Sequence, residues 1–420
     1  MKQTILTIIA KVKPDRIEDL KQLLQETREP DVERNPHIPF LDLKLLHFAS
    51  LVVNEDPGYG AYFIFENNFD GELDPYLEDL YAHAAAGLHR LYSCCVDYPS
   101  ANADDKGVLL SYLRARVVFP NAYHIGNVGR SLERMHQEAA LRDSLETFLD
   151  DVVKQGGATS PASIRQEVQT FARSQPLLAW ASSVPPRQTS MEHFLPRLKI
   201  FIAALVAFVL LPLLIPLAIV WVVMLRWTEL HEPPPEEPDV KDHVRDLVER
   251  EDRTHIVQNH MCSITTVKPG LFRRVTLRGI LWLVNLIART ADKGELSGIP
   301  SIHFAHWSLI DRGRRMLFVS NFDGSWENYL DDFIDKASTG LTAIWTNTVG
   351  FPVTNWLVKD GARDGSRFKA NARAKQTKTN VWYSAYKPLT VQTIDNNSYI
   401  REDLFTSLDE SATRNWLRRF

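Results

Sequence analysis

Cysteine is scarce in this chain, with three residues in 420. Cys94 and Cys95 are adjacent and Cys262 stands alone, so their spacing offers neither a zinc motif nor a disulfide framework. A strong charge of either sign is also missing, because the net charge is −4. This balance gives no reason to expect nucleic acid as a partner. The first apolar run, residues 5–10, is too short for a signal peptide.

Polar side chains are absent from residues 200–225, a stretch of 26 residues. A helix of that length reaches ~39 Å, which exceeds the ~30 Å hydrocarbon core of a bilayer. Arg197 and Lys199 precede the stretch and Arg226 follows it, as interfacial anchors do. The sequence therefore predicts the lipid bilayer as a partner. We expect a protein of the inner (cytoplasmic) membrane, with its globular parts facing the cytoplasm.

The prolines of this block raise a question of topology. A single span would place the two halves of the chain on opposite sides of the membrane. Pro212 and Pro216 remove two backbone donors near the middle of the block, which favours a kinked hairpin that returns to its starting side. The hairpin is the preferred hypothesis. A single tilted span and a helix buried in protein are the alternatives.

An internal duplication flanks the apolar block. Asn68-Phe69-Asp70-Gly71 returns as Asn321-Phe322-Asp323-Gly324, and a Tyr-Leu pair follows each motif at the same spacing. His47 aligns with His306 by the same comparison, and Phe119, Ala122 and Tyr123 align with Trp382, Ala385 and Tyr386. Chance similarity would not keep this order, so we expect two copies of one structural unit.

The hydrophobic periodicity of each copy predicts strand, helix, strand, strand, helix and strand. This order is that of a ferredoxin-like (βαββαβ) unit, so the fold class is α+β, with two such repeats packed as an α+β barrel. Closing strands are expected at 117–123 and 381–386, and extra helices at 130–154 and 161–174. The expected domains are repeat 1 (1–125), a helical extension and linker (126–196), a membrane segment (197–227), an acidic, proline-rich linker (228–252) and repeat 2 (253–420).

Features shared by both copies favour a structural role. Asp70 or Asp323 could accept hydrogen bonds from the first turn of the helix that follows it. Features of the second copy alone are better candidates for chemistry. We select six candidate catalytic residues in the second copy: His260, His303, His306, Asp323, Tyr383 and Tyr386. In a regular strand His303 and His306 point to opposite faces, so no joint metal site is predicted. A hydrogen-bonded core histidine is the alternative for each.

A basic segment lies near the C-terminus. Residues 359–378 hold seven basic side chains against two acids. This composition could bind phosphate, anionic lipid or a carboxylated molecule, and a solvated loop is the alternative. The candidate ligand-binding residues are Lys369, Arg373 and Lys375 from this segment, together with Trp307 and Trp382.

Several motifs of the second half resemble a family of uncharacterised bacterial membrane-associated proteins with two ferredoxin-like repeats. The motifs are Gln258-Asn259-His260, Val267-Lys268-Pro269-Gly270 and the segments 302–305, 320–332, 382–386 and 397–401. A more remote resemblance is to the dimeric α+β barrel superfamily, which includes dye-decolourising haem peroxidases. Those enzymes carry a Gly-x-x-Asp-Gly motif. Here Asp323-Gly324 is similar, but Ser320 stands at the position of the first glycine.

These observations lead to one main hypothesis and two alternatives. The main hypothesis is a membrane-attached protein with a pocket for a lipophilic or anionic small molecule in its second repeat. The first alternative is a non-catalytic membrane scaffold. The second is a haem-dependent peroxidase or oxygenase, with haem as cofactor and His303 or His306 as axial ligand.

Overall fold

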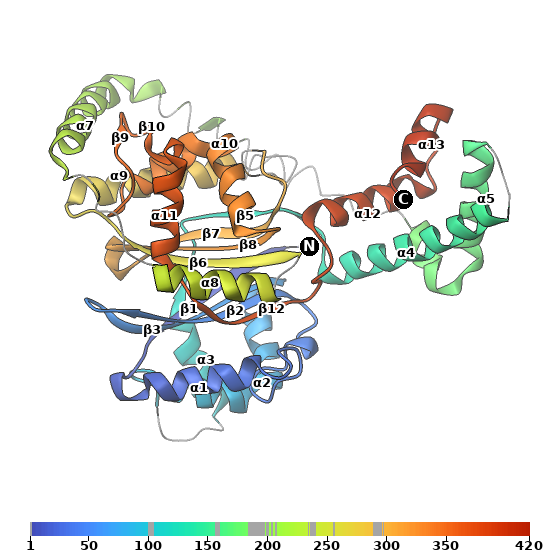
Figure 1. Cartoon of the computed structure of the whole chain (residues 1–420), viewed down its shortest axis with the longest axis horizontal. Coiled ribbons are helices and arrows are strands. Elements are labelled where there is room, and N and C mark those ends of the chain that lie inside the picture. Colours follow the sequence, from blue (N-terminus) through green and yellow to red (C-terminus); the bar gives the residue numbers. More distant parts are fainter. Residues whose placement is uncertain are drawn as a thin grey trace.

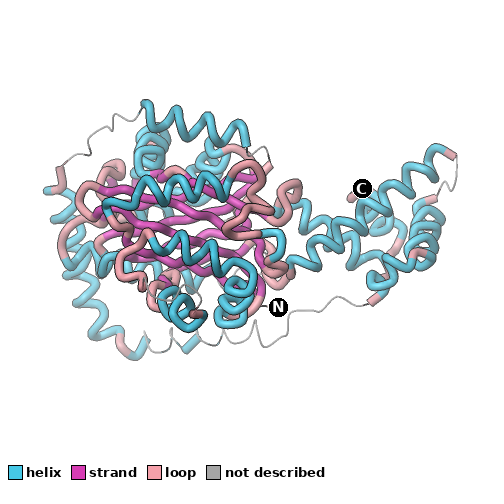
Figure 2. Tube along the Cα trace, turned by 90° about the horizontal axis from the view of Figure 1, so that it is seen from below, coloured by secondary structure: helices cyan, strands magenta, loops and turns pink. Residues whose placement is uncertain are grey.

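The computed structural model describes residues 2–99, 105–155, 160–183, 198, 201–202, 205, 208–233, 235, 241–254, 257–288, 296 and 298–420. Within these residues the chain has an α+β fold with two five-stranded antiparallel sheets. The sheets lie in one body with helices on its outside, and a helical arm projects from it (Figures 1 and 2).

The first sheet has the strand order β12-β2-β3-β1-β4. Its outer face packs against helices of the N-terminal half through apolar residues such as Leu6, Ile8, Phe63 and Phe65. Alternation along the strands places these side chains on one face. The elements are β1 (Gln3–Lys11), α1 (Ile17–Arg28), β2 (Leu46–Asp56), β3 (Gly60–Asp70), α2 (Leu73–Ser93), α3 (Lys106–Arg114) and β4 (Val117–Val118).

The second sheet has the strand order β11-β6-β8-β7-β5. Met316, Phe318 and Phe322 of its outer face pack against the covering helices. The elements are β6 (Gln258–Thr266), α9 (Leu271–Ala288), β7 (Ile302–Ile310), β8 (Arg315–Asp323), α10 (Trp326–Trp345), the hairpin β9 (Thr354–Asn355) and β10 (Lys359–Asp360), α11 (Gly365–Lys375) and β11 (Gln376–Thr377).

Each half gives a strand to the other half's sheet. β5 (Ala122–Ile125) pairs with β7, and β12 (Thr379–Ser384) pairs with β2. The predicted closing strand 117–123 is therefore wrong as a single strand, because it splits into β4 on its own sheet and β5 on the opposite sheet. The predicted strand 381–386 overlaps β12, which joins the opposite sheet, while the short β11 before it pairs with β6. The chain crosses between the sheets within a few residues. The two halves consequently form one folded body.

The contacts of these crossing strands differ from the alignment that was expected between the two halves. The backbone N–H of Gly126 donates to the carbonyl of His303 at 2.9 Å, and that of Ala385 donates to the carbonyl of His47 at 2.9 Å. His47 therefore corresponds to His303 and not to His306. Gly126, not Ala122, corresponds to Ala385, so the expected match was displaced by four residues.

The inner faces of the sheets pack against each other. Val52 and Ile64 of the first sheet meet Leu317 and Val319 of the second in one buried cluster. Alternation along β3 places Glu66 in the same layer, and its side chain is 1% exposed. A buried carboxyl in a layer between sheets is unusual enough to require hydrogen-bonding partners.

The helical arm consists of segments from both halves. α4 (Leu132–Lys154) and α5 (Pro161–Ser174) occupy the positions expected from the sequence, and Ser160 caps α5 by accepting from the N–H of Ser163 at 3.2 Å. These helices pack against α12 (Val391–Leu404) and α13 (Glu410–Leu417) around Leu141, Ile400 and Trp416. The described helices of the expected extension thus pack against the C-terminal helices.

The apolar block contains α7 (Leu211–His231), a helix long and apolar enough to cross a membrane, judged by length and composition alone. Pro212 lies in its first turn and Pro216 inside it. A turn at Leu210 separates α7 from the helical residues 208–209, so the block has a break directly before Pro212. The first arm of the predicted hairpin falls largely outside the described residues. The expected linker 228–252 is partly helical, because α7 continues to His231 and α8 covers Lys241–Thr254.

Candidate functional site

A cleft of about 840 Å³ lies at the seam between the two halves. This volume is within the ~300–1,000 Å³ typical of small-molecule sites. The first half contributes residues 28–32 at the end of α1, and the second half contributes α8, the start of β6 and the crossing segment between β11 and β12. Other lining residues are Lys387 and Pro388.

The cleft exists because of the strand crossing. β11 pairs with β6 only through Gln376 and Thr377, opposite Ser263 and Cys262. The chain then leaves for β2 in the other sheet, so the beginning of β6 has no neighbouring strand on that side. Gln258 and His260 lie there and line the cleft.

Trp382 and His260 provide the aromatic part of the lining. The indole Nε1 of Trp382 donates to Asn321 Oδ1 at 2.8 Å, and its ring stacks on Phe48 with centroids 6.1 Å apart. The Nδ1 of His260 lies 2.9 Å from Thr379 Oγ1, and the side chain is buried. Both rings are held by specific partners, so they offer a preformed surface to a ligand.

Acidic residues outnumber basic residues around this cleft. The acids are Glu29, Asp31, Asp246, Glu249 and Glu251, and the bases are Arg28, Lys378 and Lys387. The bases are already paired: Lys378 with Asp246 at 2.5 Å, Lys387 with Glu33 at 2.8 Å and Arg28 with Glu29 at 2.5 Å. The charges therefore do not favour an anionic ligand.

A chain of hydrogen bonds leads from the cleft into the layer between the sheets. Asn321 accepts from Trp382 and donates through Nδ2 to Asn68 Oδ1 at 2.9 Å. Asn68 Nδ2 donates to Glu66 Oε1 at 2.6 Å, and Ser50 Oγ donates to Glu66 Oε2 at 3.3 Å. Burial raises the pKa of Glu66 to about 8, although both hydrogen bonds oppose this shift. The carboxyl is thus neutral at pH 7.

Glu66 did not appear among the sequence candidates. The sequence feature that could have identified Glu66 is an acidic residue on the inward-facing side of a strand, where Ile64, Glu66 and Asn68 alternate with residues of the other face. The neighbouring Asn-Phe-Asp-Gly motif drew attention to Asp70 instead.

A His–Asp pair occurs in each half. His303 Nε2 lies 2.7 Å from Asp323 Oδ1, and His47 Nε2 lies 3.1 Å from Asp70 Oδ1. The hydroxyl of Tyr386 lies 3.3 Å from the Nδ1 of His47. Because both halves retain the pair, a structural role explains it better than catalysis in one copy.

The two aspartates also cap helices, but not the helices expected. Asp323 Oδ2 accepts from the N–H of Val391 at 2.8 Å, at the start of α12, and Asp70 Oδ2 accepts from the N–H of Leu132 at 2.7 Å, at the start of α4. The helix that follows Asp323 directly, α10, is capped by Ser325. The aspartates therefore attach the arm to the sheets.

The prediction that His303 and His306 point to opposite faces was wrong. The register of β7 shifts between Ile302 and Phe304, and this bulge turns His303 toward the first sheet. His306 faces the same layer, where its Nε2 lies 3.0 Å from Thr7 Oγ1. Burial lowers the pKa of His306 to about 3, so this side chain is neutral.

His303 and His306, the two candidate axial ligands for haem, line neither the seam cleft nor the cavity beneath α10. That cavity is about 20 Å³, enough for roughly one water molecule. Among the described residues, no group of three or more His, Cys, Asp or Glu side chains is placed to hold a metal ion.

The remaining sequence candidates lie away from the cleft. Tyr383 stacks on Phe40 in the core of the first half, with centroids 5.0 Å apart, and Trp307 packs beneath the helices of the second half. Of the eleven selected residues, the structure brings only His260 and Trp382 to the cleft.

The basic segment is also different from the loop considered above. Residues 365–375 form α11. Arg373 is 4% exposed, binds Glu251 at 2.7 Å and Glu327 at 3.0 Å, and lies over the ring of Trp326. Lys369 pairs with Asp331 at 2.6 Å, and Lys375 lines the small cavity beneath α10. Lys369 and Arg373 thus already have carboxylate partners.

Comparisons of the chain with protein-family models, curated proteins and solved structures found no match. Function is therefore inferred from the site itself.

Proposed function

We propose that this protein is a membrane-attached binding protein whose cleft at the seam of the two halves holds a lipophilic small molecule without net negative charge. The observation that carries the proposal is the cleft of about 840 Å³, with Trp382 and His260 in its lining and walls from both halves. Apolar side chains such as Val32, Leu247 and Val257 complete the lining. Pockets that combine apolar walls with a few oriented polar groups commonly bind small molecules.

The proposal includes an interpretation of the fold. We infer two ferredoxin-like repeats packed as an α+β barrel. The two antiparallel sheets have corresponding strand orders, β2-β3-β1-β4 and β7-β8-β6-β11, which supports this inference. The two His–Asp pairs and the two aspartate caps support it as well, because they occupy equivalent places in both halves.

Attachment to a membrane is supported by α7. Its first ten residues, 211–220, are exposed on all sides although every one of them is apolar. In water this exposure would be costly, at roughly 25 cal/mol for each Å² of apolar surface. The exchanged strands also require both halves to lie on the same side of a bilayer, since β12 follows the apolar block in sequence and pairs with β2, which precedes it. A single crossing of the membrane is incompatible with this pairing.

The ligand class follows from the charges. The anionic ligand in the original hypothesis depended on Lys369, Arg373 and Lys375, none of which lines the cleft. With five acids and three bases in the lining, a neutral or cationic amphiphile is the better match.

A binding titration tests the proposal. We would titrate the full chain in detergent micelles with N-phenyl-1-naphthylamine, a neutral lipophilic dye. We expect saturable binding at one site per chain, and Trp382→Ala should weaken it roughly tenfold, since a buried aromatic contact contributes about 1–2 kcal/mol. Trp307→Phe is the matched control, because it alters an indole outside the cleft and should leave binding unchanged.

Equal loss of binding in both variants, or binding that does not saturate, would contradict the proposal. Extraction of small molecules from the membrane-purified protein, followed by mass spectrometry, would then identify the natural ligand. Trp382→Ala should lose this molecule, whereas Trp307→Phe should retain it.

One observation favours the non-catalytic scaffold as a second candidate. The cavity between the second sheet and its helices is only about 20 Å³, so this cavity has no room for a ligand larger than water. The two candidate functions differ in whether the seam cleft binds a ligand. If neither the dye nor an extracted molecule occupies it, the scaffold function is the better account.

A further inference from the structure

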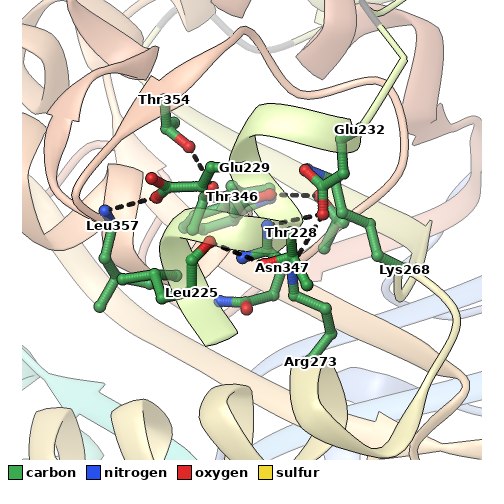
Figure 3. A network of polar contacts seen from close by, with 12 residues as sticks. Leu225, Thr228, Glu229, Glu232, Lys268, Arg273, Thr346, Asn347, Thr354 and Leu357 are labelled. Atoms are coloured by element: carbon green, nitrogen blue, oxygen red, sulfur yellow. Dashed lines mark hydrogen bonds and ion pairs between the residues drawn. The ribbon is translucent and has the colours of Figure 1, made fainter. Parts of the chain in front are cut away.

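α7 is not a free helix, because its last turns are fixed to the second half. Trp221 Nε1 donates to Thr276 Oγ1 of α9 at 2.9 Å, and Leu225 is 2% exposed. Glu232 binds Lys268 at 2.5 Å and Arg273 at 2.6 Å (Figure 3). The membrane helix is thus attached side-on to the globular fold.

The outer side of this fixed portion remains apolar. Val223, Trp227 and Leu230 are 62%, 62% and 69% exposed, although they lie in the turns that contact the second half. An anchor that held the globular part away from the bilayer would leave these side chains in water. Their exposure indicates that the bilayer reaches the surface of the second half itself.

α9 continues this apolar surface. Phe272 of α9 contacts the ring of Trp221, so the two helices are adjacent. α9 exposes Leu271, Val275, Trp282 and Leu283, with exposed fractions from 49% to 68%. Leu271, Val275 and Trp282 follow a helical spacing and form an apolar stripe on one face, which also carries the exposed Arg278. The helix has arginines and no acidic residue, which suits the surface of a membrane with anionic lipids.

The β9–β10 hairpin adds a third element. Its tip holds Trp356 and Leu357 in the left-handed backbone region, with φ of 55° and 68°. Bulky residues rarely adopt this conformation. Glu229 of α7 stabilises it by accepting from both backbone N–H groups, at 3.0 and 2.8 Å (Figure 3 shows the contact with Leu357). Arg226 lies over the ring of Trp356, which is 50% exposed.

We propose that the lipid bilayer covers one continuous surface, made of the outer side of α7, the apolar stripe of α9 and the hairpin tip at Trp356. The second half then lies against the membrane, with its tryptophans at the depth of the headgroups, where indole rings prefer to be. This inference rests on the proposed membrane attachment and extends it from one helix to a binding surface.

The test uses single cysteines in the full chain, labelled with the environment-sensitive dye nitrobenzoxadiazole. Background labelling is low because Cys94, Cys95 and Cys262 are buried. The test variants are Trp282→Cys on α9 and Trp356→Cys on the hairpin. Val223→Cys on α7 reports membrane attachment alone, and Gln22→Cys on the distant α1 is the water-exposed control.

The labelled proteins are reconstituted into vesicles of phosphatidylcholine and phosphatidylglycerol, with and without doxyl-labelled lipid. We expect blue-shifted emission and quenching by doxyl lipid at positions 223, 282 and 356, and neither effect at position 22. Probes at 282 and 356 that stay in water while position 223 is quenched would overturn the inference but leave membrane attachment intact. Water exposure at all three positions would defeat the attachment itself.

A second copy of the chain is the main competing occupant. If it covered the surface, positions 282 and 356 would be blue-shifted without vesicles, and light scattering would give the mass of a dimer. That outcome would also overturn the inference.

Discussion

Glu66 gives a stability prediction with a definite sign. Its folded pKa of about 8 lies above the ordinary value of 4.5. The unfolded chain therefore releases this proton at a lower pH than the folded protein does. Since the folded state binds more protons between pH 4.5 and about 8, the free energy of unfolding falls as the pH rises through that window.

The magnitude follows from the difference between pH 7 and the ordinary pKa of Glu66, 4.5. Holding Glu66 protonated at pH 7 costs the folded state about 3 kcal/mol relative to the unfolded chain. Glu66→Gln removes this cost, because a neutral amide retains an acceptor for Asn68 and a donor for Ser50. The hydrogen bonds of the new amide should be less well aligned, which should reduce this gain in stability by about 1 kcal/mol. We expect the variant to be more stable at pH 7 by on the order of 2 kcal/mol.

Urea unfolding in detergent micelles, followed by circular dichroism, measures the effect. The series should stay above pH 6.5, because burial lowers the pKa of His306 from 6.5 to about 3 in the folded state. Between these values the unfolded chain binds a proton that the folded protein does not, so the free energy of unfolding also falls as the pH drops below 6.5. Wild type should lose stability toward pH 8, whereas Glu66→Gln should lose much less. Glu72→Gln, at an exposed carboxylate, is the control and should follow wild type. Parallel profiles for wild type and Glu66→Gln would refute the reasoning.

Three further predictions concern separate parts of the fold. Asp323→Asn should weaken the cap at Val391 by about 1–2 kcal/mol, so amide exchange at the start of α12 should become roughly tenfold faster; an unchanged rate would contradict the cap. Glu229→Gln should weaken the hydrogen bonds to the backbone amides of Trp356 and Leu357, so protease should cut the hairpin more readily in the variant. Equal cleavage of wild type and variant would show that Glu229 does not stabilise the hairpin. Burial raises the pKa of Cys262, so iodoacetamide should modify it only after unfolding; rapid reaction in the native protein would show that the sheet layer opens.

Local patterns in the sequence predicted the two extra helices well. α4 and α5 lie where they were expected, at 130–154 and 161–174, since the signals for a helix are a property of each segment alone. Strand exchange was not predictable in the same way. A short apolar run such as Val117–Val118 has the same pattern whichever sheet it joins, and its partner is decided by distant packing.

The candidate site was only partly predictable for related reasons. His260 and Trp382 were selected because the second copy alone carries them. The opposite wall comes from residues 28–32 and α8, whose sequences resemble a loop and a linker and become a cleft wall only in three dimensions. The faces of His303 and His306 depended on a β-bulge, which leaves no clear pattern in one sequence.

The seam cleft requires both halves on the same side of the membrane, and thiol labelling in intact spheroplasts tests this most directly. Gln22→Cys on α1 and Asp335→Cys on α10 place one exposed thiol in each half. With a membrane-impermeant maleimide, the account predicts the same result for both thiols: protection in intact spheroplasts and labelling after permeabilisation, or labelling of both from outside. Labelling of one thiol from outside while the other stays protected would contradict the shared body of the two halves, and the cleft with it.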